Sequence, residues 1–311
     1  MSCTPLTLSS NTADALDSTI IVCSIAIVIH IIFWLEVLIF PALRQRNMIW
    51  LYDYILTDLL LVIRFFILYF FRRQELCLYP TFRTILCYFE ATSKFYMNTV
   101  QSYLLLALNV SRYAQIVYSR NVYVGNLRTI IITHFLIGIL PAINVIVQFM
   151  ANWTTLWRKT GESCDVQTVS LSVQIFNIFV TYIIPVTLNV ILLTICIRHV
   201  SSTVGIRNQQ IIDRRRGHQR ALLFQTIAFY SIWVALWSPY ILAFQFININ
   251  SNAGIYTSLL NYVEIAIDPA IVAILDVRFF KTWQTIWRKI RTFRHRVVTP
   301  VAIIAPNKNV T

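Results

Sequence analysis

The chain has 311 residues, of which 57% are hydrophobic and 13% charged, and its formal net charge is +13. Soluble domains carry about 25% charged residues, so this composition excludes a mainly soluble protein. The basic excess suggests a nucleic-acid partner, but the positions of the basic residues, given below, exclude one.

Residues 1–18 are polar and contain Asp14 and Asp17 but no Lys or Arg. A cleavable signal peptide would begin with a positively charged segment. We therefore expect residues 1–18 to form an extracellular N-terminal segment that is retained.

Apolar runs long enough to cross hydrocarbon, about 20 residues each, recur over residues 19–275. None alternates with a period of two, as the strands of a membrane β-barrel would. Helices satisfy their own backbone hydrogen bonds in lipid. The sequence thus predicts an all-α membrane protein, a seven-transmembrane helix bundle. The runs are 19–43, 52–71, 84–111, 128–149, 170–197, 220–247 and 255–275.

The basic residues lie mainly in alternate connections, as they do in cytoplasmic loops. Nineteen of the 26 Lys and Arg residues fall on one side: Arg44, Arg46, Arg112, Arg120, Arg128, six in 198–220 and eight in 276–311. Five fall on the other side: Arg72, Arg73, Arg83, Arg158 and Lys159. This distribution predicts the N-terminus outside and the C-terminus inside.

Two inner segments have further patterns. Residues 201–220 include Asp213-Arg-Arg-Arg216, either a basic loop that sets the topology or a surface for an acidic partner, and both can hold. In 276–311, the apolar residues 279, 280, 283, 286, 287 and 290 share one helical face. We expect an amphipathic helix there, lying on the inner leaflet of the lipid membrane before a cytoplasmic tail.

The cysteines also fit this orientation. Cys87 begins the third run and Cys164 lies in the second outer connection, so the two can pair in an oxidising compartment. Cys3 and Cys77 are also outside, and whether they pair is left open. Asn152-Trp-Thr154 is an N-glycosylation sequon on the same side.

Several motifs in chain order resemble those of the rhodopsin-like (class A) G-protein-coupled receptors. They are Asp58 in the second run, Cys87 placed 25 residues before Arg112, Asn109-Val-Ser-Arg112-Tyr113, Pro185, Leu236-Trp237-Ser-Pro239-Tyr240, and Asp268-Pro269-Ala-Ile-Val272. The resemblance covers almost the whole chain. It implies a Cys87–Cys164 disulfide and coupling to a heterotrimeric G protein through Arg112 and Tyr113.

The chain also departs from the family pattern. Ser111 replaces the acid that precedes the arginine, and Val272 replaces a tyrosine. The missing acid predicts raised basal activity. The same departures are also compatible with altered or lost coupling.

Ionisable residues inside a membrane are candidates for function. Lys94 lies 18 residues before Arg112, which is five helical turns, so both face the same way about 27 Å apart. Glu90, one turn above Lys94, can pair with it or contact a ligand. Lys94 occupies the position of the aspartate of aminergic receptors, so an anionic or carbonyl group on the ligand is favoured over an amine.

Two aromatic residues complete the predicted ligand pocket. Trp237, beside Pro239, is either a pivot that responds to ligand or a packing residue. Tyr262 stands where opsins have the lysine that holds retinal, so we expect no retinal.

A second interior group consists of Asp58, Gln101, Glu264 and Asp268. Three carboxylates in a dry core cannot all remain charged, so protons, a cation or Arg64 must neutralise some of them. We expect a site sensitive to sodium ions or protons, although a water-filled polar cluster without an ion fits equally.

The sequence therefore favours a plasma-membrane receptor for an extracellular small molecule or short peptide. An ion- or solute-translocating protein with seven helices is the alternative, because buried carboxylates also mark ion paths. An enzyme is disfavoured: the histidines at 30, 134, 199, 218 and 295 lack metal-ligand spacing, and there is no nucleophile elbow. We expect no bound metal other than sodium.

Overall fold

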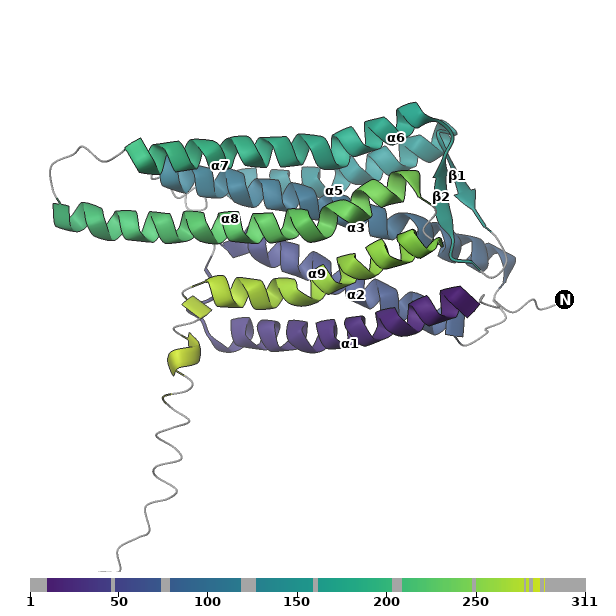
Figure 1. The fold of residues 1–311 in the computed structure, drawn as a ribbon, viewed down its shortest axis with the longest axis horizontal. Coiled ribbons are helices and arrows are strands. Elements are labelled where there is room, and N and C mark those ends of the chain that lie inside the picture. The colour runs from purple at the N-terminus through teal and green to yellow at the C-terminus, as the bar shows by residue number, and fades with distance from the viewer. Residues whose placement is uncertain are drawn as a thin grey trace, which may run out of the picture.

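The computed structural model describes residues 10–45, 48–73, 79–118, 127–158, 162–202, 209–247, 250–276, 278–279, 282–285 and 288. Long helices run side by side along one direction (Figure 1). They are α1 (Ser10–Ile39), α2 (Ile49–Arg73), α3 (Pro80–Val117), α5 (Leu127–Met150), α6 (Leu171–Ile178), α7 (Ile184–Ser202), α8 (Gln209–Phe246) and α9 (Asn252–Leu275). A π-helical turn, η2 (Phe179–Ile183), joins α6 to α7. Each predicted apolar run overlaps one of these helices or the α6–η2–α7 rod.

Local sequence accounts for several helix ends. Pro80 lies in the first turn of α3, where its missing N–H is no loss. Ser251 caps α9, with its Oγ accepting a hydrogen bond from the Gly254 N–H at 3.2 Å. Helix α1 ends at Ile39, four residues before the end of the predicted apolar run, and the chain then turns at Pro41.

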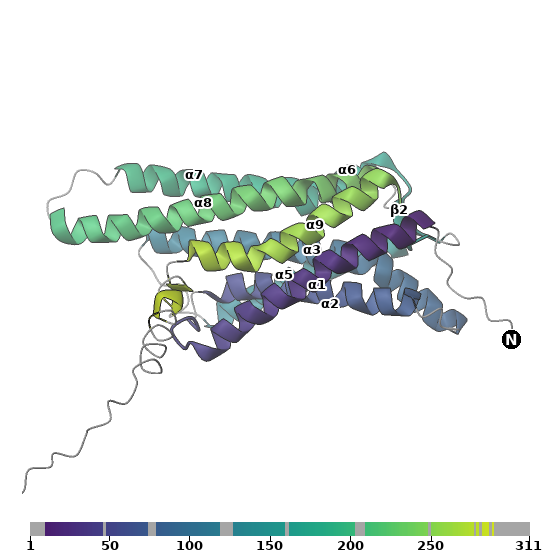
Figure 2. The same ribbon diagram turned by 60° about the horizontal axis from the view of Figure 1, so that its bottom comes forward.

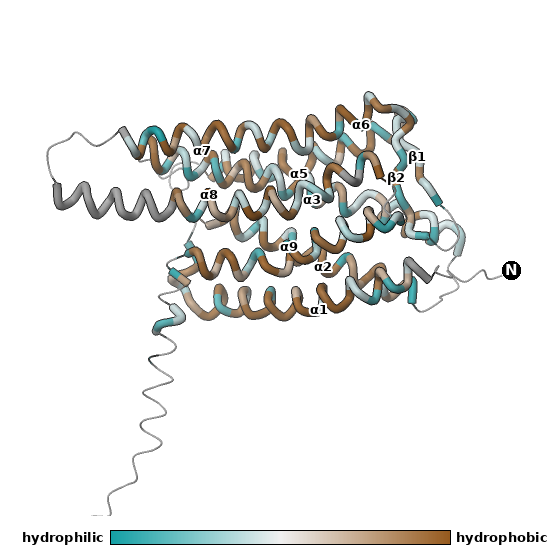
Figure 3. Tube along the Cα trace, viewed as in Figure 1, coloured by the Kyte–Doolittle hydropathy of each residue, from teal (hydrophilic) through white to brown (hydrophobic). Residues whose placement is uncertain are grey.

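The helices pack around α3 and α9. Helix α3 packs against α2, α5 and α7, and α9 lies between α1 and α8 (Figures 1 and 2). The bundle has an apolar core that also buries many polar residues, and it exposes many large apolar ones, unlike a soluble protein. Residues exposed on α1 include Ile21, Ile25, Val28, Ile32 and Leu35. Figure 3 shows how strongly hydrophobic this helix is over most of its length.

Five helical segments of the described chain are long and apolar enough to cross a membrane: Thr12–Ile39, Ile49–Arg73, Leu127–Met150, Leu171–Ser201 and Asn252–Leu275. Helices α3 and α8 fall short of that measure. Helix α3 carries interior polar residues, among them Lys94, Asn98 and Gln101. Helix α8 begins with a basic segment that contains Arg214, Arg215 and Arg216.

Three details correct the expectations from sequence. The connection after the fourth run contains a two-stranded antiparallel sheet, β1 (Thr154–Trp157) and β2 (Asp165–Thr168), which was not predicted, within a fold that is otherwise helical as predicted. Helix α1 begins at Ser10, inside the segment expected to precede the bundle. Helix α8 begins at Gln209, so the basic stretch at 213–216 is helical instead of part of a loop.

The predicted amphipathic helix falls largely outside the described residues. Phe279 was expected on its lipid-facing side, but it is fully buried and its ring stacks on Phe33 of α1 at 5.2 Å. The Trp283 indole N–H donates to Glu36 Oε1 at 2.7 Å. These contacts attach the segment after α9 to α1.

Candidate functional site

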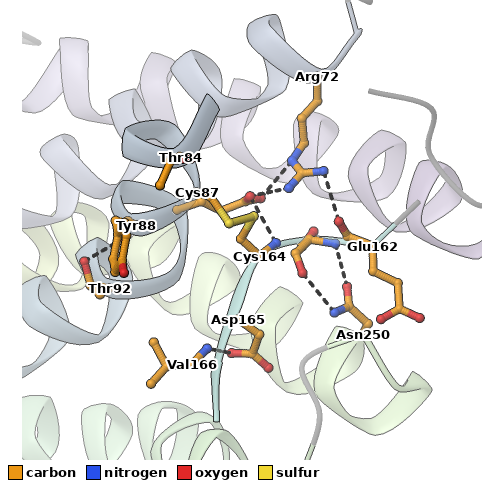
Figure 4. The surroundings of a disulfide bond; sticks show 12 residues. Arg72, Thr84, Cys87, Tyr88, Thr92, Glu162, Cys164, Asp165, Val166 and Asn250 are labelled. Carbon is orange, nitrogen blue, oxygen red and sulfur yellow. Dashed lines mark hydrogen bonds and ion pairs between the residues drawn. A yellow bond between two sulfur atoms is a disulfide. The ribbon is translucent and has the colours of Figure 1, made fainter. Parts of the chain in front are cut away.

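A disulfide joins α3 to the strand pair at one end of the bundle, which we call the disulfide end. Cys87 and Cys164 are bonded, with their Cα atoms 5.4 Å apart. The Cys164 N–H donates to Glu90 Oε2 at 3.1 Å (Figure 4). The bond therefore holds the start of β2 over the polar residues of α3.

Glu90 pairs with Arg72 of α2, and not with Lys94. The Arg72 Nε–H donates to Glu90 Oε1 at 2.8 Å, and Nη2 contacts the other carboxylate oxygen. Arg72 also reaches the Glu162 carbonyl at 3.4 Å (Figure 4). The expected Glu90–Lys94 pair is thus wrong, because the guanidinium forms a two-pronged contact with the carboxylate.

Lys94 has neutral partners. Its ammonium donates to Ser258 Oγ at 2.7 Å and lies over the rings of Tyr240 and Tyr262, 4.1 and 4.4 Å from their centroids. Only 4% of Lys94 is exposed. Cation–π contacts of this kind stabilise a desolvated ammonium.

Arg64 lies beside Lys94 and does not reach the interior carboxylates. Its Nε–H donates to Ser93 Oγ, Nη2 to the Glu90 carbonyl, and Nη1 to the Tyr262 hydroxyl at 3.4 Å. The sequence hypothesis that Arg64 neutralises Asp58, Glu264 or Asp268 is therefore wrong.

These residues line a cavity of about 120 Å³ at the disulfide end. Of the predicted pocket residues, Glu90, Lys94 and Tyr262 border it and Trp237 does not. Its other lining residues are Thr12, Ala15, Leu16, Thr19, Arg64, Phe65, Leu68, Arg72, Ala91, Ser163, Cys164, Asp165, Tyr240, Asn250, Ile255 and Ser258.

Trp237 lies deeper in the bundle and connects to the cavity through amides. It is fully buried and stacked on Trp233, with the ring centroids 4.3 Å apart. Its indole N–H donates to Asn98 Oδ1 at 3.2 Å, and Asn98 Nδ2 donates to the Lys94 carbonyl at 2.9 Å. Asn98 and Asn261 are within 3.4–3.5 Å of each other.

Further from the cavity are Asp58, Glu264 and Asp268, which we call the acid cluster. Tyr54 joins two of its members, since its hydroxyl is 2.6 Å from Asp268 Oδ2 and 3.2 Å from Glu264 Oε1. Asn261 donates to Glu264 Oε2 at 2.8 Å.

Asp58 completes the acid cluster, and the Gln101 amide donates to its Oδ1. Three buried oxygens of this region accept no hydrogen bond from any described residue: Asp58 Oδ2, Gln101 Oε1 and Asp268 Oδ1.

Arg112 lies at the other end of the bundle, which we call the opposite end. Its guanidinium donates to Thr226 Oγ1 of α8. Ser111 and Val272 are buried, and the cavity of about 10 Å³ beside Arg112 is lined largely by apolar residues such as Leu108 and Phe229. The helices are thus closed around Arg112.

The remaining predicted sites are placed as follows. Tyr113, half-buried, has its ring edge against Tyr118 at 5.8 Å. Asn152 is exposed at the disulfide end with φ 55°, a left-handed conformation that asparagine tolerates. Cys3 and Cys77 lie outside the described residues. In the described part of the chain, no three His, Cys, Asp or Glu residues are grouped as metal ligands.

Sequence reasoning missed Arg72, Tyr54, Asn98 and Asn261 as members of these sites. Arg72 was assigned to a loop because its charge ends an apolar run. Asn98 and Asn261 carry no charge, so the cost of burying an ionisable group does not point to them. Their polar amides within apolar runs are the sequence signal that indicates them.

The fold and site define a multi-pass membrane protein with a polar interior and a cavity at one end. Residues 31–271 match the family model described as 7 transmembrane receptor (rhodopsin family). A comparison with curated proteins finds no match. Since the family match spans well over half of the chain, the protein belongs to the rhodopsin family of seven-transmembrane receptors, and the resemblance found in the sequence is confirmed.

Proposed function

We propose that the chain is a G-protein-coupled receptor of the plasma membrane. It binds an extracellular small molecule or short peptide in the cavity at the disulfide end and activates a heterotrimeric G protein at the opposite end. The observation that carries this proposal is the cavity between the helices of a rhodopsin-family chain, lined by five charged side chains, at the end away from Arg112.

The proposed topology has seven spans with the N-terminus outside. Helices α3 and α8 count as spans, since they pack among the five strongly apolar segments. Lys94, Asn98 and Gln101 of α3 are buried, and so are Trp233 and Trp237 in the described part of α8. The disulfide supports an outer location for its end, because disulfides persist in oxidising compartments. The basic residues of 198–220 and 276–311 support an inner location for the other end.

Signalling requires the opposite end to open. The tight packing around Arg112 corresponds to a closed state, and ligand binding shifts the population towards an open one that admits the G protein. Arg112 and Tyr113 then contact the G protein. The absence of an acid at Ser111 lowers the barrier to this opening, so we expect basal activity.

The acid cluster fits a sodium ion. The three unpartnered oxygens of Asp58, Asp268 and Gln101 are the kind of donor that coordinates Na⁺ in membrane proteins. These residues would hold the ion, which when bound would neutralise part of the negative charge. Protonation of a carboxyl would serve the same purpose, so both sodium and pH are expected to influence the receptor. No retinal is expected.

Ligand-free nucleotide exchange on purified G proteins tests the proposal. The full chain in lipid nanodiscs should stimulate exchange, and Arg112→Ala should reduce the stimulation about 10-fold or more. Arg128→Ala is the matched control, because Arg128 is an exposed arginine at the same end, and it should stimulate like the wild type.

Equal stimulation by wild type and Arg112→Ala would contradict the assigned role of Arg112. Ion or solute flux through the folded chain without exchange on any G protein would favour the translocating alternative instead.

A further inference from the structure

Two cations meet at one tyrosine inside the cavity. Arg64 of α2 donates to the Tyr262 hydroxyl at 3.4 Å, and the Lys94 ammonium of α3 lies 4.4 Å from the centre of the same ring. Arg64 is 6% exposed and Lys94 4%. Two like charges this close in a poorly solvated site repel each other, so the arrangement favours an anion between them.

Among the described residues, no carboxylate forms a hydrogen bond or ion pair with either cation. The two carboxylate oxygens of Glu90 bond to Arg72 and to the Cys164 N–H. Arg64 contacts Glu90 through the backbone carbonyl and not through the carboxylate. Lys94 has a hydroxyl and two rings as partners.

The charges that line the cavity define the charge of its occupant. Three basic side chains, Arg64, Arg72 and Lys94, face two acids, Glu90 and Asp165. With all five ionised, one positive charge remains. Because an uncompensated buried charge is costly, the occupant that best neutralises the cavity carries a single negative charge.

The cavity's size and walls define the rest of the occupant. A cavity of about 150 Å³ holds benzene, so one of about 120 Å³ accommodates a carboxylate on an apolar body of only two or three carbons. Leu16, Phe65, Leu68 and Ile255 supply apolar wall beside the cations. A strongly hydrated dianion such as phosphate would leave both this wall and its second charge unmatched.

We propose that this cavity binds a small monocarboxylate with an apolar body. Its carboxylate lies between Arg64 and Lys94, and its body packs against the apolar wall. The inference rests on the proposed role of the cavity as the ligand site, and it names the class of that ligand. Arg64 supplies a planar pair of donors and Lys94 a compact charge.

Binding is tested on the purified full chain in nanodiscs, through its thermal unfolding midpoint and without a G protein. The probes are propanoate and butanoate, compared with propanamide, butanamide and inorganic phosphate. A saturating carboxylate should raise the midpoint by about 3 °C or more, while the amides and phosphate should leave it unchanged. No shift with either carboxylate, or an equal shift with its amide or with phosphate, would overturn the inference.

Variants locate the binding site. Arg64→Met and Lys94→Met should each weaken carboxylate binding about 30-fold or more, as expected when one partner of a buried charge pair is removed. Arg73→Met is the matched control, because Arg73 is exposed and lies outside the cavity lining, and it should bind like the wild type. Unchanged binding in both cavity variants would overturn the inference.

The wild-type comparison of carboxylate with amide decides the question even if a cavity variant fails to fold. Carboxylate binding without any G-protein activation would support this inference and contradict the proposed function. Activation without carboxylate binding would do the opposite.

Discussion

The two buried charge groups of the bundle differ in their access to solvent. Arg64 and Lys94 border a cavity at the disulfide end, whereas Asp58, Glu264 and Asp268 are sealed in the core. Both groups concentrate like charges at low dielectric. A molecule that enters the cavity can neutralise the cations. The acids depend on protons or a small cation. Under the proposed function, the cations would belong to the ligand site and the acids to a site that tunes the receptor.

A hydrogen-bonded chain connects the two groups. It runs from the Lys94 carbonyl through Asn98 and Asn261 to Glu264, and Trp237 donates to the same Asn98. A ligand that moves Lys94 therefore acts on the indole and on the acid cluster together. This contiguity is the physical basis for expecting coupling between them.

Loss of the disulfide should have the largest effect on this arrangement. Replacing both Cys87 and Cys164 by serine removes a covalent link between residues 77 positions apart, and we expect the free energy of unfolding to fall by about 4 kcal/mol. Thermal unfolding in nanodiscs measures it. Cys196→Ser, a buried cysteine outside the disulfide, is the control, and an equal loss in both proteins would show that the link adds nothing.

Loss of the ion pair between Glu90 and Arg72 should have the second-largest effect on stability. Glu90→Gln leaves Arg72 buried without its counter-ion, and we expect a destabilisation of about 3 kcal/mol. The double variant Glu90→Gln/Arg72→Met should recover part of it, since no unpaired charge remains. Thermal unfolding of the single and double variants measures the coupling, and strict additivity would show that the two residues do not interact.

Neutralising the acid cluster should change ion sensitivity while leaving the cavity intact. In the wild type, sodium and pH should alter ligand affinity by about 5-fold or more, the usual size of coupling between sites. Asp58→Asn should remove most of this sensitivity, whereas Asp53→Asn, a half-buried aspartate of the same helix, should retain it. If sodium and pH altered ligand affinity equally in Asp58→Asn and the wild type, the proposed coupling between the acid cluster and the cavity would be contradicted.

The smallest expected effect is at the opposite end. Ser111→Asp restores an acid beside Arg112 and should lower ligand-free nucleotide exchange several-fold, because a nearby carboxylate stabilises the closed position of the guanidinium. Ser111→Asn provides the uncharged control. If the aspartate variant kept wild-type basal exchange, the missing acid would not explain basal activity.

Much of the fold could be predicted from sequence, because lipid requires long apolar helices and the runs are unbroken. The strands of β1 and β2 could not, since four-residue strands leave little periodicity and depend on Cys164 being held to α3. The starts of α1 and α8 were misplaced because hydropathy marks where a helix enters lipid, and both helices begin before that point.

The candidate site was only partly predictable. Inward-facing charges such as Lys94, Asp58 and Glu264 stand out in apolar runs, so they were found. Their partners could not be assigned, because pairing depends on which helices face each other. Glu90 is one turn from Lys94 in sequence, yet it bonds to Arg72 on another helix. The rule that residues one helical turn apart pair with each other therefore did not predict the partner of Glu90. The guanidinium of Arg72 on the neighbouring helix contacts both oxygens of its carboxylate.

Carboxylate-dependent nucleotide exchange is the most direct test of a cavity that controls the opposite end. The wild-type chain, the Lys94→Met variant and the Arg73→Met control would be assayed in nanodiscs with one G protein, with and without propanoate or butanoate. We predict that a carboxylate changes the exchange rate at least about 5-fold in the wild type and the control, and not in Lys94→Met. A carboxylate that binds the wild-type cavity but leaves exchange unchanged would contradict the account.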